Sequence, residues 1–121
     1  MAANNNLKIA VVDDNKDLSI VYSKIIERLG YPNPSIFKDG TSIVKALTRD
    51  RQSFDVIIMD YQMPEMNGIE AARILQRHRT ETKIILATGL ASVEQDAIAA
   101  GLRLIKKPFS AEQLAKSLEI A

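Results

Sequence analysis

Residues 56–70 read VIIMDYQMPEMNGIE, and this stretch contains the pattern that decides the fold. An apolar run rich in Ile and Val, too short for a helix, ends directly before Asp60 and predicts a buried strand. Pro64 and Gly68 indicate a turn after this strand. A helical spacing of apolar residues then begins, so the stretch predicts a strand, a turn that starts at an acidic residue, and a helix.

The same order of features recurs along the chain. Comparable apolar runs predict further strands at residues 9–12, 84–87 and 102–105. A weaker run at residues 35–37 follows a proline-containing turn and predicts a strand near a sheet edge, where proline is tolerated. Helical spacings between the strands predict helices at residues 18–29, 41–48, 68–77, 92–100 and 110–121.

Several residues mark the ends of these helices. Two pairs match the capping box that starts a helix, Ser92 with Gln95 and Ser110 with Gln113. Gly30 and Gly101 predict helix ends, because glycine is the usual residue at a helix C-terminus. The first helix should turn one apolar face toward the core, formed by Leu18, Val21, Tyr22, Ile25, Ile26 and Leu29.

Length and composition narrow the class of protein. The 121 residues, 46% of them hydrophobic, suit one domain spanning residues 1–121. The formal net charge of +1 gives no excess of charge for binding nucleic acid or an anionic membrane. The chain has no cysteine, which excludes disulfides and thiolate chemistry and favours a reducing compartment. Since residues 1–6 lack a signal-peptide pattern and no long apolar run follows, we expect a cytoplasmic protein.

The alternation of strands and helices predicts an α/β fold with one doubly wound parallel sheet. In such sheets, ligands bind beyond the carboxyl ends of the strands, at the point where the strand order reverses. A strand order of 2-1-3-4-5 would gather the polar residues that follow the strands around one crevice. These residues are Asp13 and Asp14 after the first strand, Asp60 at the end of the third, Thr88 at the end of the fourth, and Lys107 two residues beyond the fifth.

Residues of these types suit one kind of chemistry. Three clustered carboxylates raise one another's pKa and need a cation to stay ionised. An oxygen-only ligand set with room for water and a phosphate oxygen suits Mg²⁺ better than Ca²⁺. We therefore expect a nucleophilic carboxylate beside Mg²⁺, with Lys107 as a further cation and the Thr88 hydroxyl as a donor to a phosphoryl oxygen. Taken singly, each residue also fits an ordinary cap, turn or surface position, and only the joint placement favours a site.

Four segments, in this order, resemble the response-regulator receiver domains of two-component signalling. The segments are VVDDN at residues 11–15, MDYQMPEMNGIE at residues 59–70, ATG at residues 87–89 and KPF at residues 107–109. The resemblance covers nearly the whole chain. It implies a flavodoxin-like fold of five strand–helix units.

The resemblance also implies a role for each matched residue. Asp60 would accept a phosphoryl group, Thr88 would be the switch hydroxyl, and Lys107 would contact the phosphoryl group. The Mg²⁺ ligands would be Asp13, Asp14, Asp60 and the backbone carbonyl of Gln62. The peptide bond between Lys107 and Pro108 would be cis.

The implied function is a phosphorylation-dependent signalling switch that takes its phosphoryl group from a sensor histidine kinase and acts on a downstream protein. We expect no direct contact of this domain with nucleic acid or membrane, and a monomer or weak dimer. Leu104 stands where the family usually has an aromatic switch residue. Leu102 and Arg103 replace acidic residues that are common in a dimerising subfamily.

Three other classes of protein deserve comparison. Phosphatases with an aspartyl nucleophile have the motif D-x-D, in which a second aspartate follows two residues after the nucleophile. Here Gln62 takes the place of that second aspartate, so we do not expect an enzyme that acts on external phosphoesters. A phosphate-independent adaptor, or pseudo-receiver, is the alternative that Leu104 leaves open. A nucleotide-binding domain is disfavoured because the chain has neither a P-loop nor a G-x-G-x-x-G motif.

Overall fold

The computed structural model describes residues 6–78 and 81–119. Within these residues, five parallel strands form one sheet in the order β2-β1-β3-β4-β5. The strands are β1 Ile9–Val12, β2 Ser35–Phe37, β3 Val56–Asp60, β4 Lys83–Thr88 and β5 Arg103–Lys106. The predicted α/β class, the strand order and the edge position of the 35–37 strand are confirmed.

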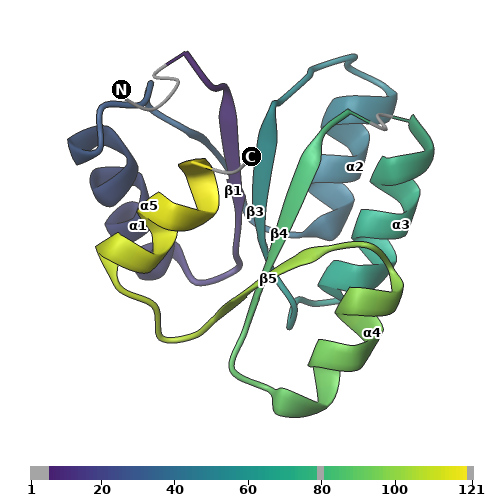
Figure 1. Cartoon of the computed structure of the whole chain (residues 1–121). Helices are drawn as coiled ribbons and strands as arrows, with labels where there is room; N and C mark the ends of the chain where they lie inside the picture. The colour runs from purple at the N-terminus through teal and green to yellow at the C-terminus, as the bar shows by residue number, and fades with distance from the viewer. Residues whose placement is uncertain (1–5, 79–80, 120–121) are drawn as a thin grey trace.

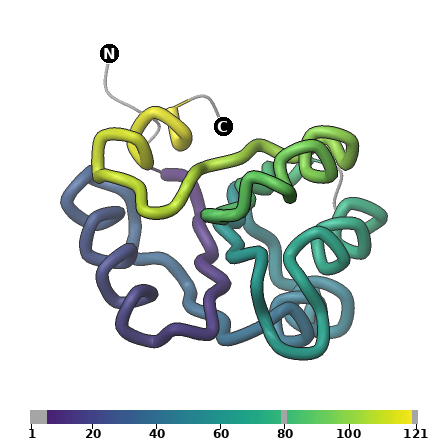
Figure 2. The backbone as a smooth tube through the Cα atoms, turned by 90° about the horizontal axis from the view of Figure 1, so that it is seen from below, coloured from purple at the N-terminus to yellow at the C-terminus, as the bar shows by residue number. Residues whose placement is uncertain are grey.

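Helices cover both faces of the sheet. The helices are α1 Lys16–Arg28, α2 Gly40–Thr48, α3 Gly68–His78, α4 Glu94–Ala99 and α5 Ala111–Glu119, with a short 3₁₀ helix η1, Ala91–Val93, before α4. Helices α1 and α5 pack on one face, and α2, α3 and α4 on the other (Figure 1). The end-on view in Figure 2 shows the sheet between these two helical layers. Among the described residues, no helix has both the length and the apolar character needed to cross a bilayer.

Two apolar clusters lie on the two faces of the sheet and explain why the central strands β1 and β3 are almost wholly apolar. In β3, Ile57 and Met59 belong to the cluster under α2 and α3, whereas Val56 and Ile58 belong to the cluster under α1 and α5. Successive side chains of a strand point to opposite faces, and both faces are covered here. Burying each large apolar side chain contributes roughly 1.5–3 kcal/mol, so the sheet is firmly held and its carboxyl ends provide a rigid edge.

Side chains cap several helices as the sequence requires. The capping box predicted at Ser110 is confirmed, because its backbone N–H donates to Gln113 Oε1 at 2.8 Å and the Gln113 N–H donates to Ser110 Oγ at 3.1 Å. A second box, not recognised in the sequence, joins Asn67 and Glu70 at the start of α3 through reciprocal bonds of 2.9 Å. Asn15 Oδ1 accepts from the N–H of Leu18 and so caps α1 next to the acidic pair.

The capping box expected at Ser92 and Gln95 is wrong. Ser92 lies inside η1, and α4 begins at Glu94 with no side-chain hydrogen bond at its N-cap. The reason is that the chain first makes a 3₁₀ turn, in which the N–H of Val93 donates to the carbonyl of Leu90 at 3.1 Å.

The last strand is also displaced by one residue from the predicted 102–105, so Lys107 follows it by one residue instead of two.

The inward face of α1 differs from the prediction at one position. Val21 is 49% exposed, whereas Ser19, Tyr22 and Ile26 are buried. Ser19 fits close to the sheet because its hydroxyl donates to the backbone carbonyl of Asp13 at 3.5 Å. A small polar residue therefore takes the place expected for a larger apolar one. Both predicted glycine helix ends are confirmed, with φ of 95° at Gly30 and 74° at Gly101.

Candidate functional site

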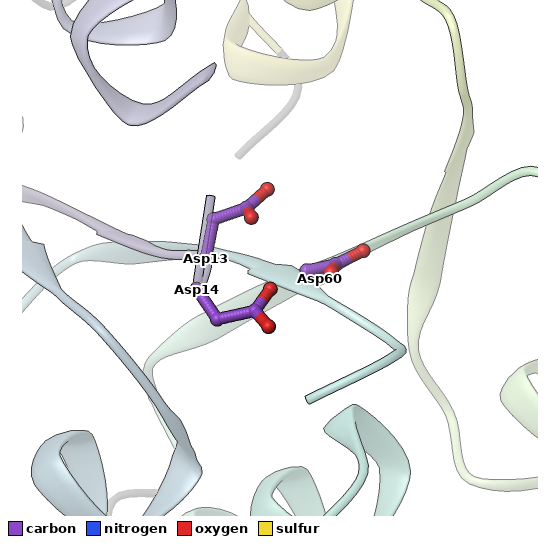
Figure 3. Close-up of side chains that lie close together, drawn as sticks. All are labelled: Asp13, Asp14 and Asp60. Carbon is purple, nitrogen blue, oxygen red and sulfur yellow. The ribbon is translucent and has the colours of Figure 1, made fainter. Parts of the chain in front are cut away.

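Three carboxylates converge at the carboxyl ends of two neighbouring strands. Asp13 and Asp14 directly follow β1, and Asp60 is the last residue of β3, which pairs with β1. One oxygen from each carboxylate lies within 4.8 Å of the others. Asp13 and Asp60 are only 4% and 9% exposed, and Asp14 is open to solvent. Figure 3 shows the three side chains facing one small region from the two strands.

Two hydrogen bonds fix the direction of Asp13, the first residue of the acidic pair. The N–H of Asp13 donates to the carbonyl of Phe37 at 3.1 Å, which extends the pairing of β1 with β2. Asp13 Oδ1 accepts from the N–H of Asn15 at 2.8 Å, so this carboxylate is held as the chain turns into α1. In Figure 3 the side chains of Asp13 and Asp14 both extend from the end of β1 toward the side on which Asp60 lies.

Lys107 completes the group from the β5–α5 loop. Its Nζ lies 3.1 Å from Asp60 Oδ1 and 3.4 Å from Asp13 Oδ2. Its backbone N–H donates to the carbonyl of Thr88 at 3.0 Å, which fastens the loop to the end of β4. The peptide bond to Pro108 is cis, as the resemblance implies. Lys107 therefore bridges the two buried carboxylates that come from β1 and β3.

The electrostatic balance of the site disfavours three ionised carboxylates. Burial raises the pKa of Asp60, the hydrogen bond and charge of Lys107 lower it, and the charges of Asp13 and Asp14 raise it further, so that the net shift is upward. Burial lowers the pKa of Lys107, but the hydrogen bond to Asp60 and the charges of Asp60 and Asp13 outweigh burial and raise it overall. Lys107 thus remains a cation and balances only one of three negative charges.

Thr88 lies at the end of β4, and its side chain is engaged with its own loop. It is 4% exposed, and its Oγ1 accepts from the N–H of Leu90 at 3.0 Å. Among the described residues, no hydrogen bond links Thr88 to the three carboxylates. Gln62 lies exposed in the turn after β3. The roles of the Thr88 hydroxyl and of the Gln62 carbonyl stay predictions.

Gly68 brings the start of α3 against the backbone that follows Asp60. Its N–H donates to the carbonyl of Tyr61 at 2.8 Å. A Cβ at this position would lie 2.5 Å from Leu86 Cδ1 and 2.6 Å from the carbonyl oxygen of Asp60, closer than packed atoms come. Only glycine allows this approach, so Gly68 helps to set where the carboxylate of Asp60 projects.

Two aromatic residues beside the site were not recognised as part of it in the sequence. Tyr22 of α1 stacks on Phe109, with ring centroids 4.7 Å apart and planes inclined by 26°. Phe109 belongs to the same short segment as Lys107, and Tyr22 was counted only as a core residue of α1. The signal available in the sequence was the aromatic residue two positions after the lysine, but no pattern connects it to a residue in the first helix.

The ligand set fits a hard divalent cation. It consists of carboxylate oxygens with no histidine or cysteine among the grouped residues, and it has more negative charge than Lys107 neutralises. Asp14 is accessible to solvent, which leaves room for the water molecules that Mg²⁺ keeps when it binds protein. The donor chemistry of Asp13, Asp14 and Asp60 is therefore that of a site for a hard divalent cation.

These features define a doubly wound α/β domain with an acidic, lysine-paired site at the carboxyl edge of its sheet. Residues 9–119 match the family described as response regulator receiver domain. The chain belongs to this family and is a receiver domain of two-component signalling.

Individual relatives agree with this assignment. The chain is 31% identical over 122 residues to chemotaxis protein CheY-3 of Vibrio cholerae, an alignment that covers 96% of this chain and 92% of that protein. A solved structure of the receiver domain of sensor histidine kinase PA1611 from Pseudomonas aeruginosa superposes with a TM-score of 0.83 at 27% identity, covering 95% of this chain and 96% of that one. In that structure a magnesium ion is coordinated in the active site cleft.

Similarity extends to a larger signalling protein. The chain is 32% identical over 82 residues to the CAI-1 autoinducer sensor kinase/phosphatase CqsS of Vibrio cholerae. That match covers 68% of this chain and 12% of the other protein. Sequences related to this chain therefore occur both as small separate proteins and as part of a larger sensor kinase/phosphatase.

Proposed function

We propose that the Asp60 carboxylate accepts a phosphoryl group from a sensor histidine kinase in a reaction that needs Mg²⁺. The observation that carries this proposal is the placement of Asp60, whose Oδ1 lies 3.1 Å from Lys107 Nζ and whose carboxylate lies within 4.8 Å of two other carboxylates. A nucleophile in this position would attack a phosphoryl group whose charge is balanced by Lys107 and, when bound, by Mg²⁺.

The transfer step needs little from the protein beyond position and charge. A carboxylate oxygen of Asp60 forms a bond to phosphorus as the bond between phosphorus and the imidazole nitrogen of the phosphohistidine breaks. The electron pair of that bond leaves with the imidazole, which takes up a proton from solvent. Lys107 holds positive charge beside the transferring oxygens, at the atom that already contacts Asp60.

Mg²⁺ would be held by the carboxylates of Asp13, Asp14 and Asp60 and by the backbone carbonyl of Gln62. When bound, Mg²⁺ supplies positive charge that neutralises both the acidic cluster and the phosphoryl oxygens. The PA1611 receiver domain, whose active site cleft coordinates magnesium, supports this choice of ion.

The phosphorylated state acts as a switch by changing a population of conformations. A phosphoryl group on Asp60 offers Lys107 and the Thr88 hydroxyl new charged acceptors, and each such contact favours one state by a few kcal/mol at most. The Thr88 hydroxyl, whose oxygen accepts from the Leu90 N–H, donates its own hydrogen to a phosphoryl oxygen. Leu104, half-buried on β5, takes the place of the usual aromatic residue, so the movement of an aromatic ring is not part of the output.

The proposal also covers the location, oligomeric state and binding partners of the domain. We propose a cytoplasmic monomer or weak dimer that acts on a downstream protein and makes no direct contact with nucleic acid or membrane. We also propose that it is not an enzyme toward external phosphoesters, because Gln62 replaces the second acidic residue of aspartyl phosphatases. Incubation with p-nitrophenyl phosphate tests this last point, and catalytic release of nitrophenol would contradict it.

The direct test is the intact mass of the protein after incubation with acetyl phosphate and Mg²⁺. One added phosphoryl group is expected, and it should be absent in the Asp60→Asn variant and in the presence of a chelator. If hydrolysis removes the adduct too quickly, beryllofluoride with Mg²⁺ should still bind to the wild type. No adduct and no beryllofluoride binding would favour the pseudo-receiver alternative.

A further inference from the structure

An aromatic stack ties helix α1 to the loop that contains Lys107. The rings of Tyr22 and Phe109 lie 4.7 Å apart between centroids, in a stacked arrangement. Tyr22 is only 8% exposed and belongs to the cluster under α1 and α5, against which Phe109 packs. A stack between a buried ring and a partly buried ring contributes stabilising energy beyond its buried area, and it restrains the relative position of the two segments.

The stack adds to the contacts that Lys107 itself makes with β4 and with the two buried carboxylates. On one side, the Lys107 N–H donates to the carbonyl of Thr88 at the end of β4. On the other side, Phe109, two residues further along, rests on Tyr22 of α1. The loop is therefore held from β4 at the backbone of Lys107 and from α1 at Phe109, two residues later, and α1 itself begins two residues after Asp14.

The Tyr22 side chain lies near the charged residues of the candidate site. Burial raises the pKa of Tyr22, the charge of Lys107 lowers it, and the charges of Asp13 and Asp60 raise it. The same phenol raises the pKa of Lys107 in turn. Tyr22 thus lies close enough to the charged group for its environment to be set by the same residues that form the candidate site.

We propose that Tyr22 is a positioning residue that holds Lys107 at the phosphoryl site through its stack on Phe109. This proposal rests on the proposed function, since it assigns a cause to the position of the lysine that the transfer requires. The stacked ring limits the movement of the loop, and Lys107 Nζ therefore stays within reach of Asp60. The ring is the part that matters, because the described contact is between ring faces.

Two substitutions remove the stack from either side, Tyr22→Leu and Phe109→Leu. Each should slow phosphorylation by acetyl phosphate at saturating Mg²⁺ by about two- to tenfold, the range expected for losing one aromatic pair. The affinity for Mg²⁺ alone should stay within about twofold, because the carboxylates remain in place. Tyr22→Phe keeps the ring and should restore the wild-type rate.

Tyr31→Leu is a matched control. Tyr31 is also a buried tyrosine of the cluster under α1 and α5, but the charge that acts on it is Glu119 instead of the acidic site. This variant should phosphorylate at the wild-type rate even if it lowers the melting temperature as much as Tyr22→Leu does. An equal loss of rate in both variants would reduce Tyr22 to a general core residue and overturn the proposal.

The decisive comparison is made in the Lys107→Ala background. If Tyr22 acts through the lysine, adding Tyr22→Leu should slow the reaction of Lys107→Ala no further, because coupled residues are not additive. An undiminished two- to tenfold effect in that background would overturn the proposal. Nitrogen relaxation of the Lys107 and Phe109 amides in metal-free protein gives a separate measure, with increased mobility expected only in the two leucine variants of the stack. If the wild type takes up no phosphoryl group, the proposed function is rejected. The relaxation measurement still tests whether the stack holds the Lys107 loop in place.

Discussion

Replacing the acceptor carboxylate by its neutral isostere should make the metal-free protein more stable. The carboxylate oxygens of the cluster lie within 4.8 Å of one another, so at an effective dielectric constant of about 20 each pair of carboxylates repels by about 3.5 kcal/mol. Lys107 Nζ, 3.1 Å from Asp60 Oδ1, attracts the Asp60 charge by about 5 kcal/mol under the same assumption. Lys107 therefore offsets the repulsion from Asp13 and Asp14, and the burial of Asp60, the largest cause of its raised pKa, leaves the charged form disfavoured overall.

Asp60→Asn should consequently raise the free energy of unfolding by about 1–2 kcal/mol near neutral pH, after allowance for the solvent exposure of Asp14. The corresponding rise in melting temperature is about 5 °C. Urea and thermal unfolding with a chelator present measure this effect. Asp50→Asn, at an exposed residue after α2, is the matched control and should change stability by less than about 0.5 kcal/mol.

The pH dependence has a definite sign. The folded-state pKa of Asp60 lies above its ordinary value of 3.8, so the folded protein retains a proton that the unfolded chain has released. The stability from that proton is fully present below 3.8 and is lost as the pH rises through the folded-state pKa. The advantage of Asp60→Asn should therefore shrink on acidification. A variant that is less stable than wild type in chelator near neutral pH would refute the balance of charges described above.

Three further substitutions test other parts of the structure. Lys107→Ala leaves two buried carboxylates without their cation, so it should lower the free energy of unfolding by about 1–3 kcal/mol in chelator. The same variant should bind Mg²⁺ more tightly in a calorimetric titration. It should still be phosphorylated, at a reduced rate, but without the conformational change seen in amide NMR spectra. Gly68→Ala places a methyl group 2.6 Å from the Asp60 carbonyl oxygen. It should lower the free energy of unfolding in urea by about 1–3 kcal/mol and slow phosphorylation. An unchanged stability and rate would mean that α3 can move away freely. Ser110→Ala removes the cap of α5 and should cost about 1 kcal/mol in urea unfolding without changing Mg²⁺ affinity, so a change in affinity would contradict a purely structural role.

The sequence predicts the sheet well because its signals are local. A short apolar run followed by an acidic or polar residue marks both the strand and the edge at which it ends, as at Asp60 and Thr88. The parallel order then follows from the alternation with helices. The convergence of Asp13, Asp14 and Asp60 could be predicted because the carboxyl ends of parallel strands meet at one edge.

The features that were missed depend on packing between distant segments. The exposure of Val21 follows from the fit of Ser19 against the backbone of Asp13, which the helical period alone does not contain. β5 extends to Lys106 because that residue pairs with Thr88 of β4, although the apolar run ends earlier. The stack of Tyr22 on Phe109 joins the first helix to the last loop, and only the folded chain brings them together.

The central claim is that Asp60 is the phosphoacceptor, and the most direct test is to locate the phosphoryl group after reaction with acetyl phosphate and Mg²⁺. Reduction with borohydride converts an aspartyl phosphate to homoserine, which tandem mass spectrometry assigns to a single position. The structure predicts homoserine at residue 60 of the wild type and at no position in Asp60→Asn. Homoserine at residue 13 or 14, or undiminished labelling of the variant, would contradict the account.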